Sequence, residues 1–325
     1  MNAPGSARPS GSSVPRVNGS SRWRGTRVIS PKAHLVINPA AGRGAARRLK
    51  DRVARAFQGE GWSVEAVETA GPGHGATLAA DLSRAGAERV IAVGGDGIVH
   101  EVANGLLHAR GGAALGVVPA GSGNDFAKLV GVYRHDPEQA ARRIAGATVR
   151  RFDAGRVGSE YFVNTLGFGF GPEVVRIRDG MPGLKGFLSY LVPVLKAFAG
   201  FVPPVLEIRA GELIEQGPVM MVEVCNGTTA GGSYRFAPAA DPADGAFDVC
   251  VIRRVGLIRF LMALPKVMKG THGRMREVRS VRARHITIHS DEPLVMHLDG
   301  ELRTPGIREC TITVEPACLP VLVAS

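Results

Sequence analysis

The chain has 325 residues, of which 45% are hydrophobic, and its formal net charge is +11. This length and apolar content predict two domains with cores of their own and exclude a chain too polar to fold. The positive charge favours a polyanionic partner: a membrane surface, a nucleic acid or a phosphate-bearing substrate. The four cysteines form no CxxC pair and lie in apolar segments, so we expect buried, reduced thiols in a cytoplasmic protein.

Residues 1–32 differ from the rest of the chain. They are rich in Ser, Gly, Pro and Arg, and they carry six basic residues and no acid. They also lack the apolar stretch of a secretory signal. We therefore predict a disordered basic tail.

Strand-like and helix-like segments alternate from residue 33 to about residue 150. Apolar runs predict strands, and apolar residues spaced three or four apart predict helices. We expect strands at 33–38, 62–67, 90–93 and 115–118, and helices at 44–57, 76–85, 98–109, 124–130 and 137–145. Repeated strand–helix units imply a Rossmann-like α/β domain in which helices cover both faces of a parallel sheet.

The pattern changes after Arg151. Short β-branched runs, separated by turn residues, predict a mostly β second domain. We expect strands at 219–225, 247–252, 285–289, 294–298 and 311–314, with helical interruptions near 172–200 and 256–270. The most apolar stretch, Phe187 to Leu206, contains Lys196 and three prolines, which favours a buried or interfacial helix over a membrane span.

Three glycine-rich turns follow strands of the first half: NPAAGRG from residue 38, GGDG from residue 94 and PAGSGND from residue 119. Ligands of parallel sheets bind beyond the carboxyl ends of the strands. Glycine lets the backbone approach a ligand, and the start of a helix favours an anion, so we expect bound phosphate. Each turn taken alone could equally serve packing or helix capping. The chain has no GxxxxGK[ST] loop and no GxGxxG at its first strand–helix turn, so a nucleotide must be held in another way.

These turns, with FDAG at 152–155, DPADG at 241–245 and HLDGE at 297–301, stand in the order found in the diacylglycerol kinase catalytic family. The chain resembles this family over roughly residues 33–320. The resemblance implies a nucleotide-binding α/β domain at 33–152 and a C-terminal β-sandwich domain at 153–325, whose last strands can return to the first domain. It places the active site in the cleft between them.

The resemblance also implies roles for individual residues. The positions that match ATP contacts are Asn38, Pro39, Ala40, Ala41, Gly42, Thr69, Gly94, Gly95, Asp96, Gly97 and Ser122. Asp96, Asp125 and Asp153 match acids that organise the catalytic magnesium, Asp299 matches the general base, and Glu301 is its neighbour. Asp244 matches the acid of a structural metal site, to which Asp241 and Ala246 contribute backbone carbonyls.

Physical chemistry supports these roles without requiring them. Phosphoryl transfer needs positioning, neutralised phosphate charge and an acceptor for the hydroxyl proton, and magnesium prefers oxygen ligands. Alone, the Asp–Gly turn at Asp299, the loop acid Asp153 and the Pro/Gly turn at 241–245 would pass for ordinary turn residues. Six histidines show no metal-ligand spacing that we trust, so we interpret them as ordinary surface or core residues: His74, His100, His272, His285, His289 and His297.

A lipid kinase without a membrane span must dock to a bilayer. Residues 253–284 hold ten Lys or Arg and one acid, mixed with large apolar residues, as in segments that bind anionic membranes. A helix packed on the sandwich is the alternative, and residues 183–201 are a second candidate for the membrane contact. Only 6% of residues are aromatic and no stacking motif is present, so we expect no nucleic-acid partner. The oligomeric state stays open.

The leading hypothesis is a cytoplasmic, peripherally membrane-associated lipid kinase that depends on ATP and magnesium, with diacylglycerol as the first candidate substrate. A sphingoid base or another lipid alcohol is the next candidate. An NAD kinase would share GGDG but leaves HLDGE unexplained. A non-catalytic lipid- or nucleic-acid-binding module is the rival from another class, and the intact acids argue against it.

Overall fold

The computed structural model describes residues 1, 30–133, 136–181 and 188–324. The predicted tail therefore lies almost wholly outside the described residues, as do residues 183–187 of the second membrane candidate. The chain divides into two units, residues 1–30 and 31–325, and the architecture below is that of the second unit. None of the helices in the described ranges is long and apolar enough to cross a membrane.

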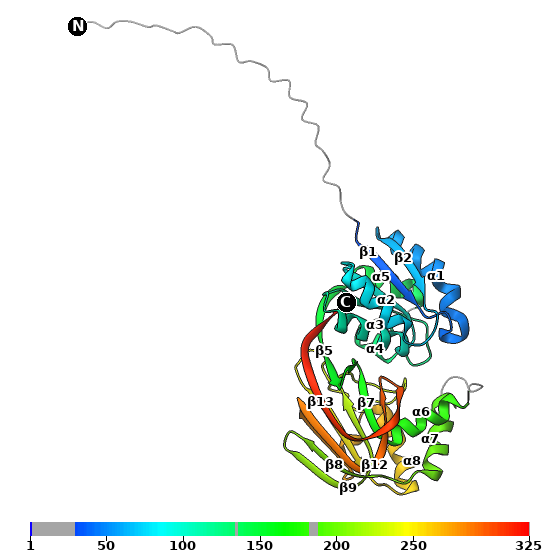
Figure 1. The fold of residues 1–325 in the computed structure, drawn as a ribbon, viewed down its shortest axis with the longest axis vertical. Coiled ribbons are helices and arrows are strands. Elements are labelled where there is room, and N and C mark those ends of the chain that lie inside the picture. Colours follow the sequence, from blue (N-terminus) through cyan, green and yellow to red (C-terminus); the bar gives the residue numbers. More distant parts are fainter. Residues whose placement is uncertain (2–29, 134–135, 182–187, 325) are drawn as a thin grey trace. The chain divides into compact units, whose positions relative to one another are not determined.

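The first half alternates strands and helices as the sequence predicts. In chain order it contains β1 (Lys32–Ile37), α1 (Ala41–Gly59), β2 (Ser63–Glu68), α2 (His74–Arg84), β3 (Arg89–Gly94), α3 (Asp96–Ala109), β4 (Ala114–Pro119), α4 (Asp125–Leu129) and α5 (Pro137–Ala145). The four strands pair in parallel in the order β4-β3-β1-β2 (Figure 1). Val90 to Val93 of β3 are fully buried, which explains why this central strand is a continuous apolar run.

The second half is mostly antiparallel strand. It contains β5 (Thr148–Val157), β6 (Glu160–Phe162), β7 (Thr165–Gly169), α6 (Phe170–Asp179), α7 (Leu188–Gly200), β8 (Val205–Ala210), β9 (Leu213–Cys225), β10 (Phe247–Arg253), α8 (Leu257–Lys269), a 3₁₀ turn (His272–Arg274), β11 (Val278–Ala283), β12 (His285–Leu298) and β13 (Glu301–Val323). The runs predicted at 285–289 and 294–298 belong to one strand, β12, whose pairing with β13 shifts register between them.

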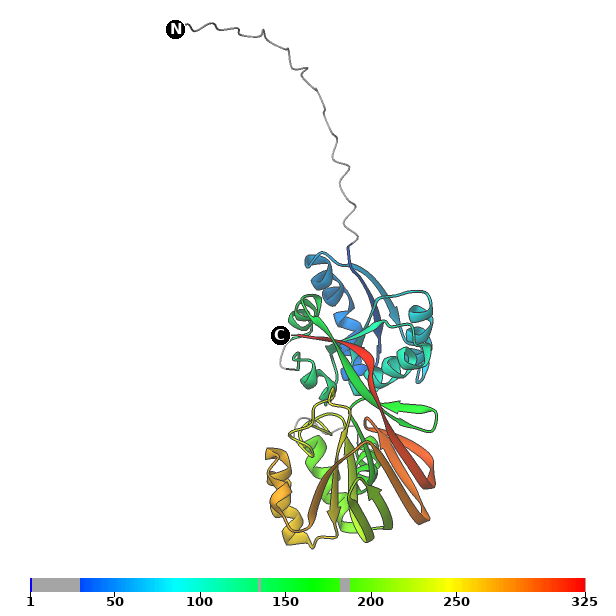
Figure 2. The ribbon, with the colours of Figure 1, turned by 90° about the vertical axis from the view of Figure 1, so that its left-hand side faces the viewer.

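The last strand joins the two halves. β13 spans 23 residues and pairs with β12 and β5, and at Val321 it pairs in parallel with Leu115 of β4. Figures 1 and 2 show this strand, in red, running from the β-rich half to the side of the α/β half. The strands consequently form one continuous 13-stranded sheet.

Two of the buried apolar clusters follow this division of the sheet. One lies around β1, β3 and β4, and a second lies between the antiparallel strands. A third cluster, which includes Phe170, Met221 and Phe260, joins α6, α7 and α8 to β9. The rings of Phe198 and Phe260 stack with their centroids 4.2 Å apart. The three helices therefore cover the sheet next to the site described below.

Candidate active site

One cavity of about 460 Å³ collects residues from both halves of the chain. Its polar end lies at the carboxyl ends of β1, β3 and β4, where the glycine-rich turns begin. Asp299 and Glu301, from the turn between β12 and β13, line its middle. Its far end is apolar and is enclosed by α6, α7, α8, β9 and β10. The cavity suits a ligand with a charged part and a long apolar part.

The glycine-rich turns approach each other more closely than side chains would allow. A Cβ atom on Gly42, where φ is +58°, would overlap the carbonyl oxygen of Ala120. A Cβ atom on Gly121 would lie 2.5 Å from the Cα of Gly95. Glycine at these positions brings backbone N–H groups and the first turn of α3 to the cavity, an arrangement that favours an anion.

Most positions expected to contact ATP face this cavity. Seven of the eleven line it: Asn38, Ala41, Gly42, Gly95, Asp96, Gly97 and Ser122. The other four, Pro39, Ala40, Thr69 and Gly94, are not among the described residues that line it. Thr69 is buried, and its N–H donates to the carbonyl oxygen of Ile37. Nucleotide contact at each position stays a prediction.

Asp96, at the start of α3, is an unusual carboxyl group. Its Oδ1 accepts a hydrogen bond from the N–H of Phe126 at 3.1 Å. Burial and the neighbouring Asp125 carboxylate raise its pKa from 3.8 to about 7, and Asp299 adds to the effect. Among the described residues no cation pairs with Asp96. A divalent ion would relieve this concentration of negative charge, so the residue is a suitable magnesium ligand.

Asp125 is held by protein donors on both oxygens. Lys128 Nζ contacts Oδ1 at 2.6 Å, and the N–H of Gly232 donates to Oδ2 at 2.7 Å. Lys128 also donates to the carbonyl oxygen of Gly232 at 2.7 Å. Asp125 thus links α4 to the loop after β9, and it places a second negative charge beside Asp96.

The structure does not bring Asp153 to this pair of acids. Its Oδ1 accepts from the N–H of Ala317 at 2.7 Å, and its Oδ2 accepts from the N–H of Gly245 at 2.6 Å. Asp153 is buried and does not line the described cavity. Of the three acids expected to organise magnesium, Asp96 and Asp125 line the cavity, whereas the carboxylate of Asp153 ties β5 to β13 and to the 241–245 turn.

The expected structural metal site is also arranged differently. Asp244 Oδ1 accepts from the N–H of Ala246, and its other oxygen pairs with the guanidinium of Arg282. Asp241 accepts from the N–H of Ala243 and lies 4.0 Å from Arg150. Within the described ranges, no three His, Cys, Asp or Glu side chains gather closely enough to hold a metal. Arginine supplies a positive charge at this turn, and a metal held by Asp244 and the backbone carbonyls of Asp241 and Ala246 stays a prediction.

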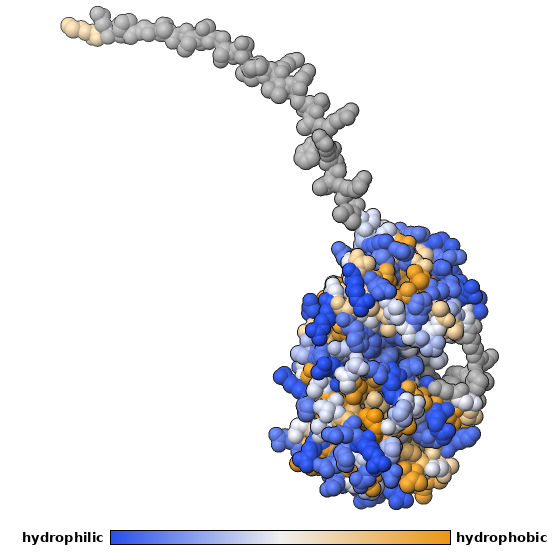
Figure 3. Space-filling model, in the orientation of Figure 1, coloured by the Kyte–Doolittle hydropathy of each residue, from blue (hydrophilic) through white to orange (hydrophobic). Residues whose placement is uncertain are grey.

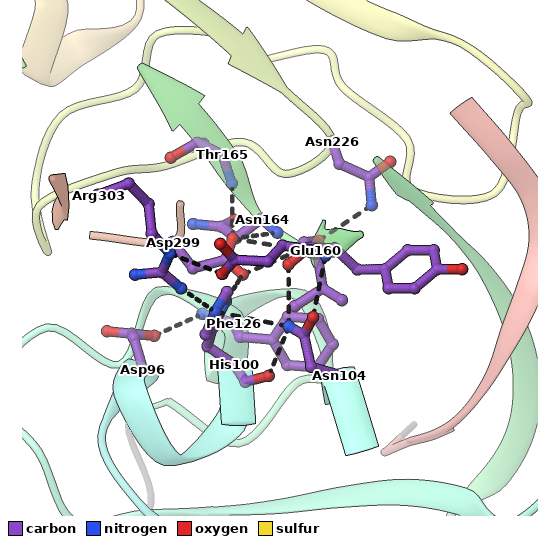
Figure 4. A network of polar contacts seen from close by, with 12 residues as sticks. Asp96, His100, Asn104, Phe126, Glu160, Asn164, Thr165, Asn226, Asp299 and Arg303 are labelled. Carbon is purple, nitrogen blue, oxygen red and sulfur yellow. Dashed lines mark hydrogen bonds and ion pairs between the residues drawn. The ribbon is translucent and has the colours of Figure 1, made fainter. Parts of the chain in front are cut away.

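Asp299 lies in the middle of the cavity, where backbone groups hold its side chain in place. Its φ is +53°, a left-handed conformation that Asp tolerates better than most residues. Its carboxylate accepts hydrogen bonds from the N–H groups of Val163, Asn164 and Thr165, at distances between 2.8 and 3.2 Å. The segment between β6 and β7 thereby fixes the position and orientation of this carboxylate (Figure 4).

A chain of polar side chains supports Asp299 from α3. His100 Nδ1 lies 2.8 Å from Asp299 Oδ2, and its Nε2 lies 2.8 Å from Arg303 Nη2 (Figure 4). Arginine can only donate, so Nε2 accepts and the ring carries its proton on Nδ1, which donates to Asp299. Arg303 is anchored in turn by Glu160 at 2.6 Å.

Asparagines fix the backbone around this chain. Asn104, one turn after His100 on α3, donates to the carbonyl oxygen of Tyr161 and accepts from its N–H, both at 2.9 Å. Asn226 donates to the carbonyl oxygens of Asp153 and Val163. These bonds connect α3, β6 and β9, so the N–H groups that face Asp299 belong to a rigid frame.

Glu301 approaches the other side of the site. Its Oε1 lies 2.7 Å from where a Cβ on Gly97 would stand, so a side chain at residue 97 would displace it. The β12–β13 turn thus brings a carboxylate of the second half against the GGDG turn of the first half.

The sequence interpretation missed His100, Arg303 and Asn104. His100 follows Asp96 by four residues and Asn104 follows His100 by four, a spacing that places three polar residues on one face of a helix. This four-residue spacing could have pointed to His100 and Asn104. No sequence pattern pointed to Arg303, because its partners His100 and Glu160 are more than 140 residues away in the chain.

Comparison with known proteins accounts for both halves of the chain. The diacylglycerol kinase catalytic domain matches residues 32–157, and the YegS C-terminal NAD kinase beta sandwich-like domain matches residues 164–323. A protein named probable lipid kinase YegS-like, from Chromohalobacter salexigens, is 32% identical over 232 residues, which cover 70% of this chain and 74% of that protein. A protein named diacylglycerol kinase, from Bacillus subtilis, is 27% identical over 271 residues, covering 83% of this chain and 89% of that one.

A solved structure confirms the likeness of the fold. The crystal structure of a diacylglycerol kinase from Bacillus anthracis covers 91% of this chain with a TM-score of 0.72 and 22% identity. This match extends over 98% of that chain. The α/β half and the sandwich-like half therefore occur together in known structures.

Proposed function

The chain belongs to the diacylglycerol kinase catalytic domain family of lipid kinases, and from this premise we propose that it transfers the γ-phosphate of ATP to a lipid hydroxyl with the help of magnesium. Diacylglycerol, which the relatives' names specify, is the first lipid to test. A sphingoid base or another lipid alcohol is the alternative.

One observation carries this proposal. The cavity that begins at the glycine-rich turns continues, past Asp299 and Glu301, into an apolar end lined by side chains such as Phe170, Val194, Met221, Ile252, Phe260 and Leu264. An NAD kinase would need no such end, because a nucleotide acceptor is polar throughout. An apolar tail in the cavity would leave its hydroxyl near the two acids.

The chain's residues divide the work of such a transfer. The backbone N–H groups at Gly42, Gly95 and Gly97 would bind phosphate oxygens. Asp96 would hold magnesium, with Asp125 adding negative charge beside it. Magnesium, when bound, neutralises phosphate charge and so favours attack by a hydroxyl.

Asp299 would take the proton of the lipid hydroxyl. His100 donates from Nδ1 to Asp299 Oδ2, and three backbone N–H groups donate to the same carboxylate. These donors orient the carboxylate, and Arg303 places a positive charge behind His100. Glu301 is the second acceptor of the proton within the site.

A transfer assay tests the proposal. Labelled ATP is incubated with dispersed diacylglycerol, a sphingoid base, NAD or no acceptor, with magnesium or with a chelator. We expect a labelled lipid only when magnesium is present. Asp299→Asn should lower kcat by at least 100-fold, in the range of general-base catalysis, and His100→Gln by about tenfold, while KM for ATP stays unchanged. His108→Gln, two helical turns further along α3, is the matched control. Label in NAD, or unchanged turnover of Asp299→Asn, would refute the proposal.

We also propose that α8 docks the enzyme on a membrane. Phe260 and Val267 of this helix are buried, whereas its other side exposes Leu257, Ile258, Leu261 and Met262. Hydrophobic residues gather on the surface over α7 and α8 (Figure 3). α8 also lines the apolar end of the cavity. A helix with one face on the cavity and one apolar face outward is suited to passing a lipid from a bilayer to the site.

The basic residues expected to reach the membrane are partly engaged elsewhere. Arg253 pairs with Glu215, Arg259 and Arg276 share Glu277, and Arg282 pairs with Asp244. The other six basic residues of this segment are exposed, and no ion pair involves them in the described part of the chain: Arg254, Lys266, Lys269, Arg274, Arg279 and Arg284. These six, rather than Arg276 and Arg282, are the better candidates for contact with anionic lipids.

A further inference from the structure

A glutamate and a histidine meet inside the cavity, away from the phosphate end. Glu223 of β9 and His297 of β12 are both aligned with Gly167, which lies on the strand between them, β7. Because Gly167 has no side chain, the two can lean across it, and His297 Nε2 lies 3.3 Å from Glu223 Oε1. A Cβ atom on Gly167 would overlap both side chains.

This pair has unused hydrogen-bonding capacity. Glu223 is 1% exposed and His297 is 5% exposed, yet both line the cavity. His297 Nδ1 has no hydrogen-bond partner among the described residues, and Glu223 Oε1 forms no hydrogen bond there either, although His297 Nε2 lies 3.3 Å from it. Leaving buried polar atoms unpaired is costly, so native proteins rarely do so without a ligand, a water or a function. The pair therefore has the properties of a binding site.

The place of the pair limits what it can bind. His297 precedes Asp299 by only two residues, and both line the cavity. Met221, two residues before Glu223, is buried and lines the apolar end. The pair thus lies between the group that would take the hydroxyl proton and the part of the cavity that would hold the hydrocarbon chain.

We propose that Glu223 and His297 bind a second polar group of the lipid, a hydrogen-bond donor a few bonds from the hydroxyl that receives the phosphate. This inference rests on the proposed lipid kinase activity and narrows its substrate. Diacylglycerol presents only ester oxygens at that position, which accept and would leave a glutamate carboxylate unpaired. A free hydroxyl or a protonated amine would donate to Glu223. The substrate class is therefore a lipid diol or amino alcohol.

Three acceptors of matched chain length, in the same detergent micelles, test this specificity with the full-length protein. They are dioctanoylglycerol, monooctanoylglycerol, which has a free second hydroxyl, and a short-chain 2-amino-1,3-diol. We expect kcat/KM to be at least tenfold higher for one donor-bearing acceptor than for dioctanoylglycerol. A preference for the amine over the monoacylglycerol would identify an ammonium ligand, and the reverse would identify a hydroxyl.

Glu223→Gln keeps the size of the side chain and removes its charge. It should lower kcat/KM at least tenfold on the preferred acceptor, as expected for the loss of a hydrogen bond to a charged group, and less than threefold on dioctanoylglycerol. KM for ATP should not change. If Glu223→Gln melts at a lower temperature than the wild type, His297→Gln is used to test the same site. Glu215→Gln is the matched control, because Glu215 is also buried on β9 but pairs with Arg253 outside the cavity.

Two results would overturn the inference: a wild-type preference for dioctanoylglycerol, or equal losses on all three acceptors in Glu223→Gln. If the wild type phosphorylates no lipid, the proposed function fails separately. The same three compounds are then compared by thermal shift of the wild type and Glu223→Gln. A shift by a donor-bearing compound that Glu223→Gln loses supports the site, and equal shifts in both proteins refute it.

Discussion

Asp96 is the residue at which stability and function oppose each other. It lies at the first turn of α3, where the helix favours negative charge, but burial and the Asp125 carboxylate raise its pKa to about 7. Without a cation, the folded protein therefore retains a proton that the unfolded chain releases near pH 4. A site that binds magnesium needs carboxylates close together, and their mutual repulsion lowers the stability of the protein when no cation is bound.

The contribution of Asp96 to the stability of the wild type should fall as the pH rises from about 4 to about 7, because at this carboxyl group the folded state binds more protons than the unfolded state in this range. Asp96→Asn removes this penalty. At pH 8 in chelator, we expect it to melt several degrees above the wild type. In assays with magnesium, it should have lost its activity. The difference should disappear near pH 4. Asp51→Asn, at an exposed position of α1, is the control, and a Tm difference that is independent of pH would contradict the prediction.

At the scale of elements, α8 and the 241–245 turn determine which apolar and basic side chains can contact a membrane or a metal ion. α8 turns an apolar face outward, and the neighbouring basic residues are divided between ion pairs and free exposed positions. The 241–245 turn uses Arg282 of β11 where a metal ion was expected. Each arrangement leads to a distinct measurement.

The double variant Ile258→Asp, Leu261→Asp should reduce binding to anionic vesicles by at least tenfold, because each apolar side chain inserted into a membrane contributes about 1 kcal/mol or more. Turnover on a monomeric short-chain acceptor should be spared. Ile214→Asp is the control, since Ile214 is also exposed but lies at the start of β9. Normal vesicle co-sedimentation of the double variant would place the membrane contact elsewhere.

The Asp244–Arg282 pair should contribute little, at most about 1 kcal/mol, because Arg282 is 56% exposed. Asp244→Ala, Arg282→Ala and the double variant should therefore lower Tm by similar small amounts. A chelator should leave the Tm of the wild type unchanged. A clear drop of the wild-type Tm in chelator that Asp244→Ala does not show would contradict this prediction and support a metal ion at the turn.

At the scale of the whole molecule, β13 makes the two halves one structure. Its first residues pair with β12, and its last residues pair with β5 and β4. Leu319, Val321 and Leu322 are buried in the core of the α/β half. The cavity needs both halves, so the same strand that joins them also keeps the β12–β13 turn over the GGDG turn.

We expect a single calorimetric transition for the whole described unit. Leu322→Ala should lower its midpoint, because truncating a buried leucine costs about 2–5 kcal/mol. The β-rich half should lose its structure at the same lowered temperature. Two transitions, of which Leu322→Ala moves only one, would show that the halves unfold independently.

The sequence predicted the elements whose pattern reflects burial. The apolar runs of β1, β3 and β4 are buried, and every helix expected in the first half is present within a few residues. Five strands escaped notice. Arginines and other polar residues interrupt the apolar residues of β5, β8 and β11: VRSVRA of β11 exposes both arginines at its surface. β6 and β7 are only 3 and 5 residues long. A strand that is half in water resembles a loop when composition alone is considered.

The sequence by itself determined the order of the motifs, the glycine-rich turns suited to phosphate, and Asp96 and Asp299 as candidate acids. Each of these can be recognised from a few neighbouring residues. Only the tertiary structure decided which side chains share a site. It separated Asp153 from Asp96, placed Arg282 against Asp244, and put His100 behind Asp299. It also brought Glu223 and His297 together across Gly167. These pairings depend on strand register and helix packing between segments far apart in the chain, for which no local pattern exists.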